Sequence, residues 1–398
     1  MPDLSQELPD SADVVIVGGG LVGACLAIAL ESLPLRVVML EAHAGTSMPA
    51  VFDQRNLSFN MATVNALNAL GILPLLEAPS GSIRTIETSR VGDFGRVLMR
   101  ASDYGRPEFG RVVIASDFGR ALESRLSSVG NLERIRPASF LSSSLEGESR
   151  TVTFTSPSGT HRLRAPLLVG ADGAQSAVRA SLGIDASTYE YGHQLFVAAG
   201  RLSRPLNGQA YERLSDEGPI ALLPRGDGLV GVVLGVRNDD ADRVASLSDD
   251  EYAVYVQTRF GFRAGKFSSF GPRSRYPGVR MIADSVIAPH AVLIGNAAQS
   301  LHPVGAQGFN LGLRDALTLA ESLESLETYA TRRAEDRART VQMSHQMASL
   351  GTRSDLPTRL LRETAMVLSG RVRSVQSELV ARAMGLAGDV PRLCRDPL

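Results

Sequence analysis

A glycine-rich segment near the start of the chain has the residue types and spacing to hold a phosphate group. Residues 18–23 read Gly-Gly-Gly-Leu-Val-Gly, directly after the apolar run Val14–Val17. Gly18 permits a tight turn, Gly20 lets the backbone approach a pyrophosphate, and Gly23 allows close packing of a helix on a strand. The helix N-terminus then offers free N–H groups to the phosphate. Glu41 lies about 20 residues further on, where a carboxylate can hold a ribose hydroxyl, so the segment predicts dinucleotide binding.

Two further segments place polar groups directly after apolar runs. Asp172–Arg179 reads Asp-Gly-Ala-Gln-Ser-Ala-Val-Arg and supplies a turn, a helix start and a positive group one helical turn along. Its alternative interpretation is a helix cap with a surface arginine. Gly295–Asn310 contains a rigid His-Pro pair ahead of a helix. The N-terminus of that helix could stabilise negative charge on a bound ring, or the segment could be an ordinary helix-initiating loop.

These motifs need short buried strands that end where each motif begins. Continuous apolar, β-branched runs are typical of parallel strands covered on both faces. Such runs predict strands at Val14–Val17, Arg36–Leu40, Leu167–Gly170 and Ala291–Ile294. Helices are predicted at Leu21–Leu33, at Phe59–Leu70 with Gly71 at its end, from an N-cap at Ser116 or Asp117 through Leu126, and from about Gly308 through Leu326.

The middle of the chain has a different pattern. Between Tyr191 and Arg280, alternating segments are separated by Gly, Pro and Asp turns, which indicates a mostly antiparallel sheet. A helical stretch near Asp249–Phe260 interrupts it, and Tyr329–Gly388 is helix-rich. Strand-like alternation also occurs at Ser82–Arg90, Arg96–Arg100 and Leu132–Arg164. Nucleotide-type strands on both sides of a different sheet predict one domain inserted into another.

The composition excludes several classes of function. A net charge of -1 and a pI near 6.6 give no basic footprint for nucleic acid. Lys266 is the only lysine, so no Gly-Lys-Ser/Thr phosphate loop exists, and the histidines lack the spacing of metal ligands. Cys25 and Cys394 are expected to be free thiols in a reducing cytoplasm. Without an apolar run of about 20 residues, the chain is expected to be cytoplasmic, at most peripheral on the inner membrane through its arginine-rich C-terminal helices.

Together, the three motifs resemble those of the FAD-dependent aromatic hydroxylases of ubiquinone biosynthesis, whose fold binds FAD with three such fingerprints in this order. The resemblance covers roughly Asp13 to Leu326. The run GNAAQSLHP followed by QGFNLGLRDA is most similar to the subgroup that hydroxylates 2-octaprenyl-6-methoxyphenol, in which Asn rather than Asp follows the first glycine. Asp355-Leu356-Pro357 and Ala381–Leu386 also resemble that subgroup.

The resemblance implies roles for individual positions. Asn296 stands where the family usually has an aspartate that binds the ribityl chain, and Arg55 matches an arginine near the isoalloxazine and pyrophosphate. The implied cofactor-binding residues are Gly18, Gly20, Gly23, Glu41, Arg55, Arg120, Asp172, Gly173, Asn296, Gly308 and Asn310. Asp172 and Gly173 match a motif implicated in both FAD and NAD(P)H binding. The loop with Pro303, Gly305 and Gln307 matches the segment beside the flavin ring, and no catalytic side chain is identified.

The resemblance also implies the architecture. It is an α/β protein with a Rossmann-type FAD-binding domain, an inserted, mostly antiparallel substrate domain and a helical C-terminus, as in para-hydroxybenzoate-hydroxylase-like folds. Residues 12–80, 110–190 and 281–328 would form the FAD-binding domain, 81–109 and 191–280 the substrate domain, and 329–398 the helical segment. Five residues of the middle region would either line the substrate pocket or pack in the core: Leu195, Phe196, Leu222, Leu223 and Pro224.

The implied activity is hydroxylation of a prenylated phenol in ubiquinone biosynthesis. FAD reduced by NAD(P)H would react with O2 and pass one oxygen atom to the ring through a flavin C4a-hydroperoxide. Two alternatives stay open, a prenyl-chain flavin reductase of the same fold and a non-catalytic scaffold in a biosynthetic complex. Residues 305–308 read Gly-Ala-Gln-Gly where the family usually has Ala-Gly-Gln-Gly. If that position requires a positive φ, Ala306 is strained, unless Gly305 takes over the turn.

Overall fold

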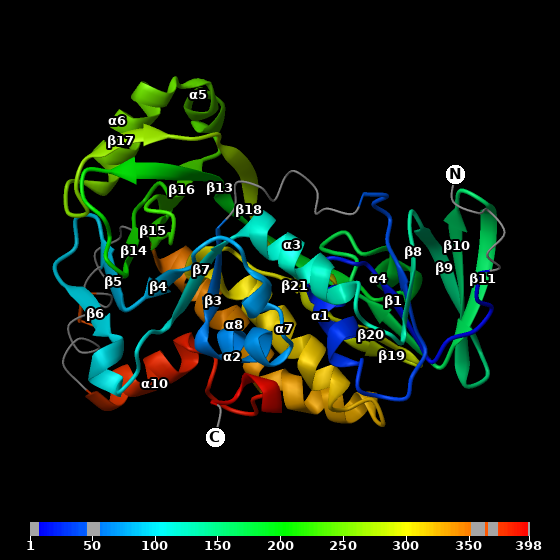
Figure 1. The fold of residues 1–398 in the computed structure, drawn as a ribbon. Coiled ribbons are helices and arrows are strands. Elements are labelled where there is room, and N and C mark those ends of the chain that lie inside the picture. The colour runs from blue at the N-terminus through cyan, green and yellow to red at the C-terminus, as the bar shows by residue number, and fades with distance from the viewer. Residues whose placement is uncertain (1–7, 46–55, 352–362, 365–372, 397–398) are drawn as a thin grey trace.

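Two large sheets dominate the molecule. The computed structural model describes residues 8–45, 56–351, 363–364 and 373–396. One sheet has six strands, the other has nine, and two smaller sheets have three strands each. In Figure 1 the nine-stranded sheet lies toward the left and the six-stranded sheet to the right of the centre, with one of the three-stranded sheets at the right-hand end. The predicted α/β fold class is confirmed.

The six-stranded sheet carries the three motifs. Its order is β19 (Ile287–Ala288), β20 (Ala291–Leu293), β12 (Leu167–Gly170), β1 (Val14–Val17), β2 (Val37–Leu40) and β8 (Leu132–Ile135). All neighbours are parallel except β19 and β20. The carboxyl ends of β1, β2, β12 and β20 therefore lie along one edge. The motifs, which follow these strands in sequence, are brought together there.

Both faces of this sheet are covered, which explains its continuous apolar runs. Val14 and Ile16 pack with the helices α1 (Leu21–Ala29), α3 (Ala115–Leu126) and α7 (Gln307–Ala320). Val15 and Val17 face the opposite way, against the three-stranded sheet β11 (Gly159–Ala165), β10 (Ser149–Ser156) and β9 (Ser139–Glu146). Because successive side chains of a strand alternate in direction, each strand contributes to two cores.

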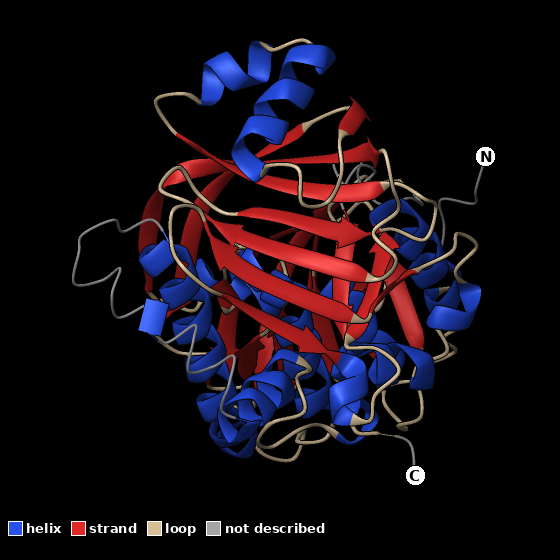
Figure 2. Cartoon of the chain, turned by 90° about the vertical axis from the view of Figure 1, so that its left-hand side faces the viewer, coloured by secondary structure: helices blue, strands red, loops and turns tan. Residues whose placement is uncertain are grey.

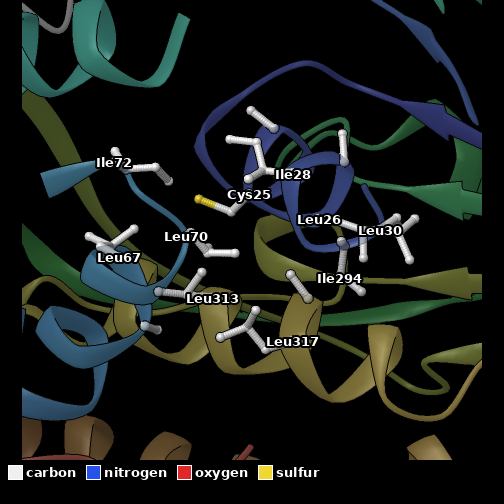
Figure 3. Close-up of a cluster of buried hydrophobic side chains, with 14 of the residues drawn as sticks. Cys25, Leu26, Ile28, Leu30, Leu67, Leu70, Ile72, Ile294, Leu313 and Leu317 are labelled. Atoms are coloured by element: carbon white, nitrogen blue, oxygen red, sulfur yellow. The ribbon is translucent and has the colours of Figure 1, made fainter. Parts of the chain in front are cut away.

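The helical face is a dense apolar cluster. In Figure 3, Cys25 of α1, Leu67 of α2 (Met61–Ala69) and Leu313 of α7 point toward one another. Cys25 and Cys394 are both free and buried. Burial of the Cys25 thiol raises its pKa far above the ordinary value, because the thiolate would lose its hydration.

The nine-stranded sheet is built mainly from the middle of the chain. Its order is β21 (Gln299–Ser300), β18 (Ser274–Ala283), β13 (Ala186–Leu202), β16 (Val230–Arg237), β15 (Ile220–Pro224), β14 (Gln209–Leu214), β5 (Thr85–Arg90) and β6 (Arg96–Arg100), with β17 (Phe267–Phe270) paired to β13. All pairs are antiparallel except β14 with β5. The prediction of a mostly antiparallel sheet is confirmed.

Helices α5 (Ala241–Ser246) and α6 (Asp249–Phe260) cover one face of this sheet, and they lie above its strands in Figure 2. The second three-stranded sheet lies between the two large sheets and contains β3 (Asn56–Asn60), β7 (Gly110–Ile114) and β4 (Gly81–Ile83). The remaining helices are α4 (Ala177–Ser181), α8 (Leu326–Gly351) and α10 (Arg373–Ala383).

Four predicted helix boundaries are wrong for local reasons. The first helix ends at Ala29 rather than Leu33, ahead of Pro34, which disfavours helical backbone at the residue before it. The second begins only at Met61, because residues 56–60 form a strand and the Asn60 side chain accepts the Thr63 N–H as N-cap.

The third helix begins at Ala115 with no side-chain cap, so neither Ser116 nor Asp117 is its N-cap. Asp117 instead accepts the backbone N–H groups of Glu77 and Ala78. The fourth helix spans Gln307–Ala320, and a separate helix starts at Leu326. The predicted helix at Asp249–Phe260 has the predicted bounds.

Candidate active site

One cavity of about 880 Å³ connects the two large sheets. The loops after β1, β2, β12 and β20 form one end of its lining, and a face of the nine-stranded sheet forms the other. Its size lies within the usual range for small-molecule and cofactor sites. Open parallel sheets bind their ligands outside the carboxyl ends of the strands, which is where this cavity begins.

The first glycine loop fits a pyrophosphate. Gly18 has φ +106°, and a Cβ there would lie 2.5 Å from the Ala171 carbonyl oxygen. A Cβ at Gly23 would lie 2.1 Å from the Gly18 carbonyl oxygen, so this glycine serves packing and does not line the cavity. At Gly20, by contrast, a Cβ would have no heavy atom within 4 Å. Gly20 begins α1 without any side-chain cap, so the first N–H groups of the helix are left for a ligand.

Glu41 borders the cavity beside this loop. It is 8% exposed, and Arg134 Nε donates to its Oε1 at 2.8 Å. Arg134 also makes a two-pronged pair with Glu123. Burial opposes the charge on Arg134, but the hydrogen bonds that it donates to Glu123 and Glu41 outweigh this effect and raise the pKa of the guanidinium. The arginine therefore fixes the Glu41 carboxylate while leaving Oε2 for a hydroxyl donor.

The second motif caps a helix and also binds the backbone of the third motif. Asp172 accepts the Ser176 hydroxyl at 2.5 Å and the Val178 N–H at 3.1 Å, and Ser176 caps α4. Gly173 has φ +90° and lines the cavity. Arg179 is not a simple surface group, because it donates to the Ala297 carbonyl at 2.9 Å and so holds the backbone of the third motif.

A buried ionic network supports the third motif from behind. Asp315 accepts the Gly295 N–H at 3.3 Å and the Gln299 amide at 2.6 Å. Arg333 pairs with it at 2.8 Å, and both side chains are at most 2% exposed. Asp336 completes the network, and although burial opposes its charge, Arg314 and Arg333 lower its pKa to about 2. Asn296, the predicted ribityl ligand, lines the cavity in front of this network.

The loop before α7 contains two consecutive left-handed residues. Gly305 has φ +71°, and Ala306 has φ +51° and ψ +39°. The left-handed turn at Gly305 therefore does not spare Ala306 a left-handed conformation of its own. The expected strain at Ala306 is therefore present. Asn310 stabilises the bend, since its amide donates to the Ala306 carbonyl at 2.6 Å and to the Ser58 carbonyl at 3.0 Å.

A pair of buried histidines lies behind this loop. His302 Nε2 and His193 Nε2 are 2.7 Å apart, and the Val304 N–H donates to His302 Nδ1. The proton of His302 must therefore sit on Nε2, from which it is donated to His193. Burial, together with His193, lowers the pKa of His302 to about 3, so the ring is neutral and packs the loop.

The predicted site residues do not all reach the cavity. Those that line it are Gly18, Gly20, Glu41, Asp172, Gly173, Asn296, Pro303, Gly305 and Gly308. Gly23, Gln307 and Asn310 lie just behind its wall. The Asn310 side chain accepts the Asn60 N–H and donates to the Ala306 carbonyl, so its amide is already bonded within the protein. Arg120 is 56% exposed in its side chain and pairs with Asp117 at 2.9 Å, away from the lining. Arg55 and Asp355-Leu356-Pro357 lie outside the described residues.

Many lining residues were not predicted, and two of them carry polar groups of interest, Glu212 and Asn56. Glu212, on β14, brings a carboxyl to the sheet face of the cavity. Asn56, on β3, has a buried Nδ2 without a partner among the residues that the structure describes. Neither residue belongs to a sequence motif. The only signal for Glu212 was a polar residue among positions that otherwise carry apolar side chains, and this signal can be interpreted only when the strand register is known.

The strand register also determines which of the five residues predicted in the middle region line the cavity and which pack in the core. Leu195 and Leu223 line the cavity, whereas Phe196 and Leu222 point to the opposite face and pack against α5 and α6. Pro224 does not belong to the described lining. Because adjacent residues of a strand face opposite sides of the sheet, the pocket interpretation holds for Leu195 and Leu223 and the core interpretation for Phe196 and Leu222.

Within the described residues, no cluster of His, Cys, Asp and Glu has the arrangement of a metal site. The described helices include none long and apolar enough to cross a bilayer.

Several known proteins resemble this chain in sequence and in fold. A family model described as FAD binding domain matches residues 11–344. Ubiquinone hydroxylase UbiL of Rhodospirillum rubrum is 30% identical, over 96% of this chain and 92% of its own. The 3-demethoxyubiquinol 3-hydroxylase of Escherichia coli is 27% identical, over 80% of this chain and 81% of its own. Among solved structures, p-nitrophenol 4-monooxygenase of Pseudomonas putida superposes with a TM-score of 0.77, at 20% identity, covering 95% of this chain and 99% of its own.

Proposed function

We propose that this chain, which belongs to the FAD-binding-domain family, hydroxylates the aromatic ring of a prenylated phenol in ubiquinone biosynthesis. It is a FAD-dependent monooxygenase of the same family as the ubiquinone hydroxylases it resembles. We infer the phenolic, hydrophobic substrate from the activities named for those relatives.

The observation that carries the proposal is the continuity of the cavity. At one end, four parallel strands present glycines and free N–H groups, and Gly20, Gly173 and Gly308 each leave open space where a Cβ would be. At the other end, the lining is a largely apolar sheet face. A cofactor held at the first end would leave an apolar site beside its ring, which suits a hydrophobic phenol.

We assign FAD binding to the residues at the first end. Gly18, Gly20 and the start of α1 would hold the pyrophosphate, Glu41 a ribose hydroxyl, and Asn296 the ribityl chain. When bound, FAD supplies the oxygen-activating chemistry, with O2 as oxidant and NAD(P)H as the proposed electron donor. The protein's own part is to orient the phenol and to exclude water from it.

The predicted division of the chain agrees with this assignment. Residues 81–109 and 191–280 would form the substrate domain, residues 12–80, 110–190 and 281–328 the FAD-binding domain, and 329–398 the helical segment. The parallel pairing of β14 with β5 supports the first grouping, because it places residues 85–90 inside the nine-stranded sheet. Contact with a biosynthetic complex or with a membrane surface stays a prediction, which salt-sensitive pelleting with anionic liposomes would test.

The test uses FAD-loaded protein, NADH or NADPH, isotopically labelled O2 and a panel of prenylated phenols. We expect a product one labelled oxygen atom heavier, formed only when all components are present. Reduction of the prenyl chain without oxygen insertion would favour the reductase alternative. Failure to take up FAD at all would favour the scaffold alternative and overturn the proposal.

A further inference from the structure

The sheet face of the cavity carries a single carboxyl group among its described lining residues. Glu212 pairs in register with Ala221 of β15, which pairs with Val233 of β16, which pairs with Val197 of β13. These four positions form one row across the cavity wall. The neighbour of Glu212 on the other side is Thr88 of β5. A carboxyl in a row of small apolar side chains is costly, because the charged form loses its hydration.

Within the described part of the chain, no cation pairs with Glu212 to compensate for this cost. Its Oε1 is buried and has no hydrogen-bond partner within the described part of the chain. Burial raises the pKa of the carboxyl to about 7 and outweighs the backbone N–H of Gly305, which favours the charged form. The groups that face it from β5, β15 and its own strand are Thr88, Ala221, Ala210 and Leu214, and none of these titrates. The side chain as a whole is only half-buried, since it borders the cavity.

Other buried carboxylates of this protein are paired. Glu87, on the adjacent strand but facing away, has Arg263 and Arg96 as partners. Asp315 has Arg333. Buried polar atoms of folded proteins are nearly always satisfied, and an exception at a cavity wall indicates a partner that comes from outside the chain.

The position of Glu212 limits what that partner can be. The carboxyl lies near Gly305 of the loop before α7, and both residues line the cavity. A ring that lies on the row of Val197, Val233 and Ala221 would direct a substituent at Glu212. Because the terminal torsion of glutamate is soft, a small rotation can present either oxygen to the cavity.

We propose that Glu212 is a catalytic residue that binds the phenolic hydroxyl of the substrate and accepts its proton. The inference rests on the proposed hydroxylase function. The phenol O–H bond breaks, an O–H bond forms on the Glu212 carboxylate, and the electron pair stays on the phenolic oxygen. This oxygen then donates electron density to the ring during oxygen insertion, with O2 as oxidant and NAD(P)H as two-electron donor. Loss of the ring C–H proton to solvent restores aromaticity, and Glu212 returns its proton to the product oxygen.

The first experiment measures binding without turnover. Oxidised, FAD-loaded wild type and Glu212→Gln are titrated with a prenylated phenol and with its methyl ether, and the flavin spectrum reports binding. Ionised Glu212 accepts a charge-assisted hydrogen bond from the phenol that the ether cannot make. For wild type, we expect phenol affinity to improve about tenfold as the pH rises through the range near 7, with no change for the ether. In Glu212→Gln, both affinities should be independent of pH.

The second experiment measures turnover. General base catalysis is worth about 100-fold or more, so Glu212→Gln should lose about that factor in kcat while O2 consumption continues and releases hydrogen peroxide. Glutamine keeps the length of the side chain and a polar end group, and it removes only the titratable carboxyl. A merely structural role would therefore leave the glutamine variant near wild type and damage only Glu212→Leu. Glu217→Gln, on the loop after the same strand and paired with Arg259, serves as the matched control and should keep full activity.

The outcomes separate this inference from the proposed function. If wild type forms no hydroxylated product from any phenol, the proposed function fails. If wild type hydroxylates but Glu212→Gln has the same kcat and the same pH profile, the proposed function stands and the role of Glu212 is overturned. Normal FAD uptake by Glu212→Gln shows that the variant is folded and makes either result decisive.

Discussion

The two ends of the cavity are built in different ways. At the strand ends, glycines, a helix N-terminus and backbone groups form much of the surface, together with the carboxylates of Glu41 and Asp172, and the Asp315 network lies behind it. Along the nine-stranded sheet, side chains form the surface, and Glu212 is the one carboxyl in it among the described residues. The first end would bind a constant ligand through the backbone, and the second would select its ligand through side chains. Substitutions should therefore affect the two ends differently.

The largest effect is expected behind the first end. Asp315→Asn removes one of the two carboxylates paired with Arg333, whose side chain is 1% exposed, and leaves Asp336 as its remaining acidic partner among the described residues. Removing one member of a buried pair costs about 3–5 kcal/mol of unfolding free energy. Chemical denaturation should show this loss, accompanied by weaker FAD binding because Gly295 and Gln299 lose their anchor. The control Asp239→Asn breaks an exposed pair with Arg237 and should leave the denaturation midpoint unchanged. Equal stability of the two variants would contradict this account.

Leu222 and Leu223 are neighbours on β15, and substituting each of them tests whether they face opposite sides of the nine-stranded sheet. Leu222→Ala empties a fully buried position against α5 and α6 and should cost about 2–5 kcal/mol of stability. Leu223→Ala enlarges the cavity instead, so it should cost much less stability and raise the KM for the phenol. The measurement is denaturation plus steady-state kinetics on both variants. The opposite assignment of effects would show that the register is wrong.

The Glu212 carboxyl should also appear in the pH dependence of stability. Its pKa is raised on folding from 4.5 to about 7, so the folded protein holds more protons than the unfolded chain between these values. Stability contributed by this group is therefore lost as the pH rises through that range, by about 1–3 kcal/mol. Relative to wild type, FAD-free Glu212→Gln should gain stability over the same range. Parallel stability curves for the two proteins would contradict the buried carboxyl.

The smallest effect is expected at the junction of the two ends. Ala306→Gly removes a non-glycine residue from a left-handed conformation and should stabilise the protein by about 1 kcal/mol. Thermal unfolding measures this, and Ala306→Val should shift the melting temperature in the opposite direction. A glycine variant less stable than wild type would show that Ala306 is not strained.

The first end could be predicted from sequence because backbone binding leaves fixed glycine spacings. Gly18, Gly20 and Glu41 were identified from this spacing, Asp172 and Asn296 from the resemblance to the hydroxylases, and all five line the cavity. The second end could not, since whether Leu222 or Leu223 faces the cavity depends on strand pairing across distant segments. Glu212 was missed for the same reason. Asn60 was missed as a helix cap because the apolar pattern around it continues into the preceding strand.

The order of strands in the six-stranded sheet has a consequence for protein synthesis. β1 is made first, but its partner β12 follows about 150 residues later, and β20 must also join before the sheet is complete. Arg333, which holds the third motif, leaves the ribosome later still. The nascent chain must therefore keep one edge of its first, strongly apolar strand protected until β12 is made, and a chain truncated before residue 333 should depend on chaperones and bind no cofactor.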